Sequence, residues 1–167
     1  MNKTSTDVLV IGAGPIGLFS VFELGQLGMK SCVVDSLDII GGQCSSLYPE
    51  KPIYDIPAYP EISGQKLIDN LFNQIKPFSP KFILGEKVEK ITNEDDEFLV
   101  YTSNNKSIRC KCILIAAGNG AFGPNKPPLK DIEKYENKSI FYHITNKSIF
   151  KNKKIAIAGG GDSAVDW

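Results

Sequence analysis

The sequence has no net charge and very little arginine or histidine. Its 167 residues contain 19 lysines and arginines against 19 aspartates and glutamates, and one histidine. A nucleic-acid-binding protein or a polybasic membrane-binding protein carries a clear excess of positive charge, so we expect neither partner here. His143 has no acid or nucleophile near it in a catalytic pattern, which favours a structural role.

Metal-binding and membrane-spanning patterns are also missing. The cysteines form no C-x-x-C pair, so the sequence predicts neither a disulfide scaffold nor a metal site. No run reaches the roughly 18 apolar residues of a membrane span. Val8–Leu18 is apolar enough for a signal peptide, but it contains three glycines and a proline. A buried strand and a glycine turn explain it better, and we expect a cytoplasmic protein with reduced thiols.

A strand, a glycine-rich turn, a helix and a second strand open the sequence. Val8–Ile11 is short, apolar and rich in β-branched residues, as in a central parallel strand. Apolar residues recur at helical spacing from Leu18 to Leu27, and Gly28 is expected to end the helix. Ser31–Val34 predicts the second strand. This order predicts an α/β, Rossmann-like domain with a parallel sheet.

The turn G-A-G-P-I-G has the spacing of a dinucleotide-binding motif. Gly12 allows the tight turn, Gly14 lets the backbone approach a pyrophosphate, and Gly17 lets the helix pack near the sheet. The helix that starts near Pro15 offers free N–H groups to the phosphates. Asp35 ends the second strand, where its carboxylate can accept hydrogen bonds from ribose hydroxyls and would repel a 2′-phosphate. The site is therefore predicted to hold FAD or NAD, with a glycine turn that binds nothing as the alternative.

The segment after the second strand is expected to approach the same ligand. The double glycine at Gly41 and Gly42 permits close approach of the backbone, and Gln43 offers an amide. The run from Leu47 to Pro60 contains four prolines, which favour a stiff, extended path. Its three tyrosines could line a flat aromatic ring of a ligand, with ordinary half-buried packing as the alternative.

The middle of the chain predicts one helix and several strands. Ser63–Ile75 has apolar residues at helical spacing. Glu86–Ile91, Glu97–Thr102 and Ser107–Cys112 predict three short strands of an antiparallel β-meander. Ile113–Gly118 predicts a further buried strand, whose small residues at the end can lie close to a cofactor.

The end of the chain repeats the pattern of its beginning. Lys154–Ala158 predicts a strand, and a G-x-G-x-x-A turn follows from Gly159 to Ala164. Val165 to Trp167 would begin a helix. The two motifs are about 147 residues apart, counted from Gly12 to Gly159. The sequence thus contains one dinucleotide-binding unit and the start of a second.

This order of motifs resembles that of flavoprotein reductases with two dinucleotide-binding domains. Within that class the chain closely resembles ferredoxin/flavodoxin–NADP⁺ reductases of the thioredoxin-reductase-like type. The matching segments are GAGPIGLFSVFELGQLGMKSCVVDS, GGQCSSLYPEKPIYDIPAYPEISGQKL, AAGNGAFGPNKP and IAGGGDSAVDW. The resemblance covers the N-terminal half of a full member. It implies an FAD-binding domain at residues 1–118, and a linker with the truncated start of an NADPH-binding domain at residues 119–167.

The resemblance also implies roles for individual residues. Tyr48 would stack on the isoalloxazine with Gln43 nearby, Val88 would contact the adenine end, and Phe122 would lie near the flavin. No side chain is expected to act as a catalytic acid or base, because the cofactor carries the chemistry. The residues implied to bind FAD are Gly12, Gly14, Pro15, Gly17, Asp35, Gly42, Gln43, Tyr48, Val88, Ala117, Gly118 and Phe122, and those implied for NADPH are Gly159, Gly161 and Ala164.

The activity implied by the resemblance is hydride transfer between NADPH and FAD, with electron transfer to or from ferredoxin or flavodoxin, in a homodimer. Thioredoxin reductases carry a C-x-x-C shortly before the second glycine motif, whereas Tyr142–Lys147 contains no cysteine here. Reduction of a disulfide partner is therefore not expected, and the truncated chain is expected to turn over little or not at all alone. Two alternatives stay open: a flavoprotein reductase with another acceptor, and a non-catalytic fragment that binds an adenine nucleotide or docks onto a partner.

Overall fold

The computed structural model describes residues 3–121, 123, 126–144 and 146–166. The chain divides into two compact units, residues 1–122 and residues 123–167. Within the described residues, none of the helices combines the length and the apolar character needed to cross a membrane.

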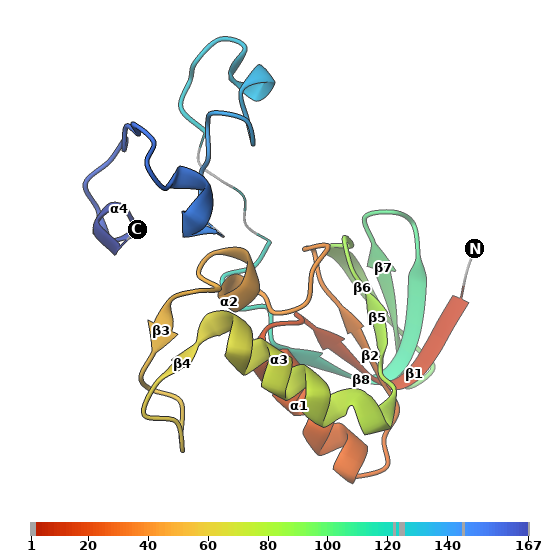
Figure 1. The fold of residues 1–167 in the computed structure, drawn as a ribbon. Coiled ribbons are helices and arrows are strands. Elements are labelled where there is room, and N and C mark those ends of the chain that lie inside the picture. Colours follow the sequence, from red (N-terminus) through yellow and green to blue (C-terminus); the bar gives the residue numbers. More distant parts are fainter. Residues whose placement is uncertain (1–2, 122, 124–125, 145, 167) are drawn as a thin grey trace. The chain divides into compact units, whose positions relative to one another are not determined.

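A six-stranded mixed sheet forms the centre of the first unit, in the order β5-β2-β1-β8-β7-β6 (Figure 1). Strands β5, β2, β1 and β8 run parallel, whereas β7 pairs antiparallel with both β8 and β6. The parallel part and the antiparallel meander were both predicted from the sequence, and the structure confirms this fold class. The strands are β1 (Lys3–Ile11), β2 (Ser31–Val34), β5 (Lys81–Ile83), β6 (Val88–Glu94), β7 (Glu97–Thr102) and β8 (Ser107–Ile115).

Helices α1 (Pro15–Gln26) and α3 (Gly64–Ile75) lie side by side on one face of this sheet (Figure 1). Helix α3 begins at the predicted place because the Ser63 hydroxyl accepts a 3.3 Å hydrogen bond from the backbone N–H of Lys66. Alternate residues of the strands enter two cores: Val10 and Val33 pack with the helices, and Leu9 packs with the meander. The sheet is thus buried on both faces, which explains the continuous apolar runs in β1 and β2.

One strand is longer than predicted. Ser107–Cys112 and Ile113–Gly118 were expected to be separate strands, but β8 runs without a break from Ser107 to Ile115. The reason is its pairing: β1 pairs with β8 from Lys3 to Ile11, while β7 pairs only with its first part. A single strand therefore belongs to the parallel sheet and to the meander at once.

The connection between β2 and α3 contains short elements only. They are α2 (Gln43–Ser46) and a two-stranded antiparallel sheet of β3 (Pro52–Ile53) and β4 (Ile62–Ser63). The proline-rich run was predicted to be extended, but only its residues Pro52–Ile53 form a strand, which pairs with Ile62–Ser63 beyond the run. Helix α3 continues into the 3-10 helix η1 (Lys76–Phe78).

Among its described residues, the second unit contains three short helical segments, namely η2 (Ile132–Lys134), η3 (Lys147–Phe150) and α4 (Asp162–Asp166). The predicted strand at 154–158 is wrong, because no described residue of the chain pairs with this segment and Ile155 and Ile157 are exposed. A strand needs a neighbour for its backbone N–H and C=O groups. Helix α4 begins at Asp162, three residues before the predicted start at Val165.

Candidate functional site

A cavity of about 510 Å³ lies in the first unit, where the carboxyl ends of β1, β2 and β8 meet the start of α1. In open α/β sheets this edge is the usual place for ligands. The volume lies within the range of roughly 300–1,000 Å³ that is typical of small-molecule sites. The predicted residues that line it are Gly12, Gly14, Pro15, Asp35, Gly42, Gln43, Tyr48, Val88, Ala117 and Gly118.

The glycine turn after β1 is as tight as its motif predicts. The backbone N–H of Gly12 donates a 2.8 Å hydrogen bond to the carbonyl oxygen of Val34, and Gly12 has a φ of +110°. A Cβ on Gly12 would collide with the backbone carbonyl of Ala116 on the neighbouring strand. A Cβ on Gly17 would collide with the carbonyl of Gly12, so Gly17 lets α1 pack against the turn, although it does not line the cavity.

Helix α1 begins at the cavity without a side-chain cap. Gly14 is its N-cap residue and supplies no side-chain hydrogen bond, and Pro15 stands in its first turn. The first N–H groups of a helix have no acceptor within the helix, and proline costs nothing there because it lacks an N–H. The uncapped helix start therefore leaves backbone donors and the positive end of the helix dipole for an anionic group of a ligand.

Asp35 joins the end of β2 to the glycine turn. Its Oδ2 accepts a 2.6 Å hydrogen bond from the backbone N–H of Ala13, and its Oδ1 accepts a 2.9 Å bond from that of Leu37. Each carboxylate oxygen has a second lone pair. Asp35 lines the cavity, so these lone pairs can accept hydrogen bonds from the hydroxyls of a sugar.

The double glycine brings a second segment of backbone against the first turn. The N–H of Gly41 donates a 2.9 Å hydrogen bond to the carbonyl of Ala13. Gly42 has a φ of +57°, and a Cβ there would lie 3.0 Å from the Cα of Gly14. The two backbones thus face each other with no side chain between them. Gln43 follows directly as the first residue of α2, which sequence patterns did not predict.

Tyr48 forms part of the cavity wall beyond α2. The thiol of Cys44 donates a weak hydrogen bond to the Tyr48 hydroxyl, with 3.9 Å between Sγ and Oη. Burial raises the pKa of Tyr48 to about 12, and it also raises the pKa of Cys44. Both groups stay protonated and neutral at pH 7. Tyr48 therefore presents an uncharged aromatic ring to the cavity.

The start of β6 lines the end of the cavity that is opposite Tyr48 and near Asp35. Val88 lies at a register shift in the pairing with β7, between Val88 and Lys90. Such bulges are frequent beside functional sites, where they redirect a side chain. Ala117 and Gly118 follow β8 and line the cavity, and Gly118 leaves about 4.0 Å between the place of a Cβ and the Gln43 side-chain nitrogen.

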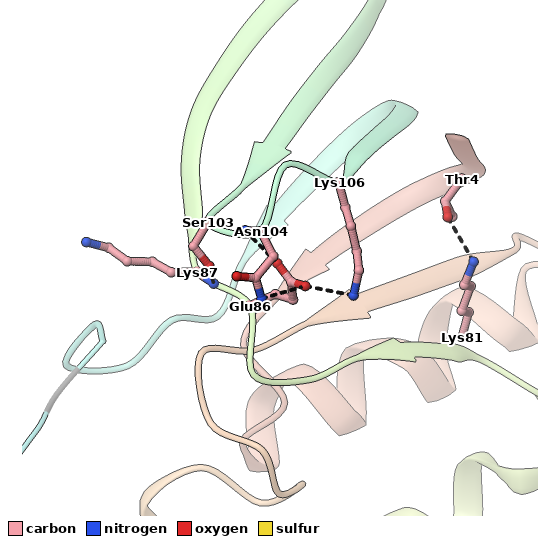
Figure 2. Close-up of polar contacts among 7 residues, drawn as sticks. All are labelled: Thr4, Lys81, Glu86, Lys87, Ser103, Asn104 and Lys106. Carbon is pink, nitrogen blue, oxygen red and sulfur yellow. Dashed lines mark hydrogen bonds and ion pairs between the residues drawn. The ribbon is translucent and has the colours of Figure 1, made fainter. Parts of the chain in front are cut away.

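Glu86 also lines this end of the cavity, and sequence reasoning missed it. It was expected to begin a short strand of the meander, but it precedes β6 and is only 2% exposed. Its carboxylate lies between Lys106 and Asn104, as Figure 2 shows, with 2.7 Å to the Lys106 ammonium. The Lys106 ammonium is the main reason why the pKa of Glu86 is lowered to about 2. Its partner is 20 residues away, so no local pattern could reveal it.

The other predicted residues lie elsewhere. Phe122 lies outside the described residues. Gly159, Gly161 and Ala164 belong to the second unit, where Gly159 has a φ of +125° and the turn leads into α4, as the motif predicts. The cavity residues that the sequence did not single out include Leu37, Cys44, Glu86, Lys87 and Asn119.

The arrangement can bind a dinucleotide along its length. Backbone N–H groups and the start of α1 suit a pyrophosphate, Asp35 suits a ribose, and Tyr48 suits a flat ring. Tyr48 and Cys44 are both neutral, so neither of these two side chains offers a charged acid or base to the cavity. A bound cofactor would therefore have to supply any redox chemistry itself.

Comparisons with known proteins agree with this geometry. Residues 6–167 match the family model of pyridine nucleotide-disulphide oxidoreductases. The chain is 58% identical over 167 residues to a protein of Ehrlichia canis named ferredoxin–NADP reductase, and the match covers 100% of this chain and 49% of that protein. A protein of Anaplasma phagocytophilum with the same name is 58% identical over 161 residues, covering 96% and 48%. The chain spans about half the length of the curated relatives it matches.

A solved structure shows the same fold at low sequence identity. The crystal structure of thioredoxin reductase from Streptococcus pyogenes superimposes with a TM-score of 0.61 at 23% identity. The match covers 83% of this chain and 42% of that one.

Proposed function

Because the chain belongs to the pyridine nucleotide-disulphide oxidoreductase family, we propose that its cavity binds FAD and that it forms part of a ferredoxin–NADP⁺ reductase. The observation that carries the proposal is the pair of contacts at the glycine turn: an uncapped helix start at Gly14, and Asp35 held against Ala13. Together they offer donors to a pyrophosphate and acceptors to a ribose within one cavity.

The residues present fit FAD. A Cβ at Gly12 or Gly17 would collide with backbone, so only glycine fits these positions of the turn, and the backbones of Gly14 and Gly42 approach each other with no side chain between them. Asp35 would hold the ribose hydroxyls, and Tyr48 would lie against the isoalloxazine. When bound, FAD would supply an acceptor for the hydride of NADPH that can release its two electrons singly.

The chain's own residues would bind and orient the cofactor. The start of α1 would stabilise the negative pyrophosphate, and the neutral Tyr48 and Cys44 would exclude water from one side of the flavin without competing for its protons. Val88 and Lys87 would flank the adenine end, and Gln43 and Gly118 would border the flavin end.

The remaining assignments rest on the relatives. NADPH as the hydride donor, ferredoxin or flavodoxin as the electron carrier and a homodimeric assembly are proposals for the whole protein, of which this chain matches about half. Gly159, Gly161 and Ala164 would begin the NADPH site. The stretch 142–147 contains no cysteine, which favours an electron carrier over a disulfide as the acceptor.

Flavin titration tests the central proposal. The chain, purified and freed of bound flavin, should quench FAD fluorescence with one FAD bound per chain and shift the flavin absorbance. A colourless chain that takes up no added FAD would overturn the proposal. Reduction of cytochrome c by NADPH, with and without ferredoxin, then tests the reductase assignment separately. Little or no turnover is expected of this chain alone, since it matches about half of its relatives. Turnover that depends on ferredoxin would support the reductase assignment and contradict that expectation, and equal turnover without ferredoxin would favour another acceptor.

A further inference from the structure

We propose that the ion pair between Glu86 and Lys106 is a positioning pair that holds Asp35 and the start of β6 in place for the adenosine half of FAD. This inference rests on the proposed function. Neither residue would bind the cofactor directly: Lys106 does not line the cavity, and the carboxylate of Glu86 is already occupied by partners from the protein.

Both oxygens of the Glu86 carboxylate contact residues of the turn between β7 and β8. Its Oε1 lies 2.7 Å from the Lys106 ammonium and accepts a 3.1 Å hydrogen bond from the Asn104 side chain. Its Oε2 accepts a 3.2 Å bond from the Asn104 backbone N–H. Lys106 and Asn104 belong to the turn between β7 and β8, so one buried carboxylate is bonded to two residues of this turn (Figure 2).

The backbone of the same segment is bound to the ribose-reading residue on its other side. The N–H of Glu86 donates a 2.9 Å hydrogen bond to the carbonyl of Asp35, and the N–H of Gly85 donates a 2.8 Å bond to that of Leu37. The Asp35 carboxylate in turn accepts from Leu37 and from Ala13 in the glycine turn. A continuous series of contacts thus leads from Lys106 to the glycine turn.

A second pair of contacts fixes the direction of the loop. The N–H of Lys87 donates to the Ser103 hydroxyl at 3.2 Å, and the N–H of Ser103 donates to the Lys87 carbonyl at 2.8 Å (Figure 2). Val88 follows at once and lines the cavity. The turn between β7 and β8 therefore fixes the positions of Asp35 and Val88, the two residues that would border the adenosine.

Charge and burial explain why the pair matters. The Glu86 side chain is 2% exposed, whereas Lys106 is 45% exposed. Removal of Lys106 leaves a buried carboxylate without its counter-charge, which is strongly unfavourable. The carboxylate would then turn toward water in the cavity, and the loop at 85–88 would move with it.

The experiment compares FAD with FMN, which lacks the adenosine half. Glu86→Gln and Lys106→Met should each raise the Kd of FAD about tenfold and leave the Kd of FMN within about twofold, measured by flavin fluorescence titration. Lys106→Arg should bind FAD like the wild type, because it restores the cation. The matched control is Glu97→Gln, since Glu97 pairs with Arg109 on the same meander and does not line the cavity.

Hydrogen exchange gives a readout that needs no ligand. In the flavin-free chain, Lys106→Met should speed exchange of the amides at 34–38 and 84–88 about tenfold, and Glu97→Gln should not. If the wild type binds no FAD, the proposed function fails while this measurement still decides the positioning role. Unchanged exchange at 34–38, unchanged FAD affinity, or an equal loss of FAD and FMN affinity would each overturn the inference.

Discussion

The backbone N–H of Ala13 donates a 2.6 Å hydrogen bond to Oδ2 of Asp35, across 22 residues of the chain. This bond joins the first glycine turn to the end of the second parallel strand. The same carboxylate accepts from Leu37, so one side chain organises both walls of the cavity. A ligand that binds there meets an acceptor whose position is fixed before it arrives.

Asp35→Ala should therefore weaken FAD binding strongly. Hydrogen bonds that involve a charged group contribute about 1.5–3 kcal/mol, so the Kd of FAD should rise about 10- to 100-fold. Fluorescence titration measures this change. Asp38→Ala is the matched control, because Asp38 is exposed and does not line the cavity. Equal effects of the two substitutions would show that charge alone, and not the place of Asp35, determines the affinity.

Two glycines of α1 should respond differently to alanine. A Cβ on Gly17 would collide with the backbone carbonyl of Gly12, whereas a Cβ on Gly25 would meet the ring of Phe78. The backbone of a tight turn can shift only slightly to relieve this clash. Gly17→Ala should therefore lower the free energy of unfolding by about 1–3 kcal/mol. The nearest Phe78 atom is Cγ, which ring rotation does not move, so Gly25→Ala must displace the whole Phe78 side chain and should also lower stability, offset by the roughly 1 kcal/mol that alanine gains as the better helix former.

Urea unfolding and FAD titration distinguish the two cases. Gly17→Ala should lower both stability and FAD affinity, while Gly25→Ala should leave FAD affinity unchanged, because Gly25 lies near the far end of α1. A Gly17→Ala variant as stable as the wild type would contradict the close packing of the helix against the turn.

Sequence patterns predicted the parts of this fold that local spacing controls. The apolar run before Gly12 and the helical spacing of α1 and of α3 are each encoded within a few residues. The continuity of β8 was not predictable, because it depends on which strands pair with each half. Glu86 was missed for the same reason: its ion-pair partner, Lys106, belongs to a turn 20 residues further along the chain.

Glu86 also makes stability depend on pH in the acid range. Its pKa is lowered from 4.5 to about 2, chiefly by the Lys106 ammonium, so the folded state binds this proton less readily than the unfolded chain. The stabilisation is fully present above about pH 4.5 and is lost as the pH falls toward about 2. Lys106→Met should flatten this dependence, measured as the free energy of unfolding in urea from pH 2 to pH 6.

The control for this measurement is Lys90→Met. Lys90 is exposed on β6, and within the part of the chain that the structure describes it forms no ion pair. Its replacement should leave the slope of stability against pH like that of the wild type. A wild-type stability that does not change between pH 4.5 and pH 2 would contradict the assigned ion pair.

The four cysteines should react with maleimide in a fixed order. Cys112 is exposed, whereas Cys32, Cys44 and Cys110 are buried. Burial raises the pKa of Cys32 to about 11 and raises those of Cys44 and Cys110 as well, so few thiolates are available at pH 8. Peptide mass spectrometry should find Cys112 labelled first. Added FAD should slow the labelling of Cys44, which lines the cavity, and leave Cys112 unaffected.

Tyr48 should contribute to the affinity for the flavin end of FAD, as Asp35 should for the adenosine end. Its ring lines the cavity, and its hydroxyl receives only a weak bond from Cys44. Tyr48→Phe keeps the ring and should bind FAD like the wild type. Tyr48→Ala removes a stacking surface worth about 0.5–1.5 kcal/mol beyond its buried area, so the Kd values of FAD and FMN should both rise about tenfold. Tyr54→Ala is the control, because Tyr54 is 65% exposed and lies outside this cavity. A loss of affinity for FAD alone would place Tyr48 at the adenosine and reverse the orientation proposed for the cofactor.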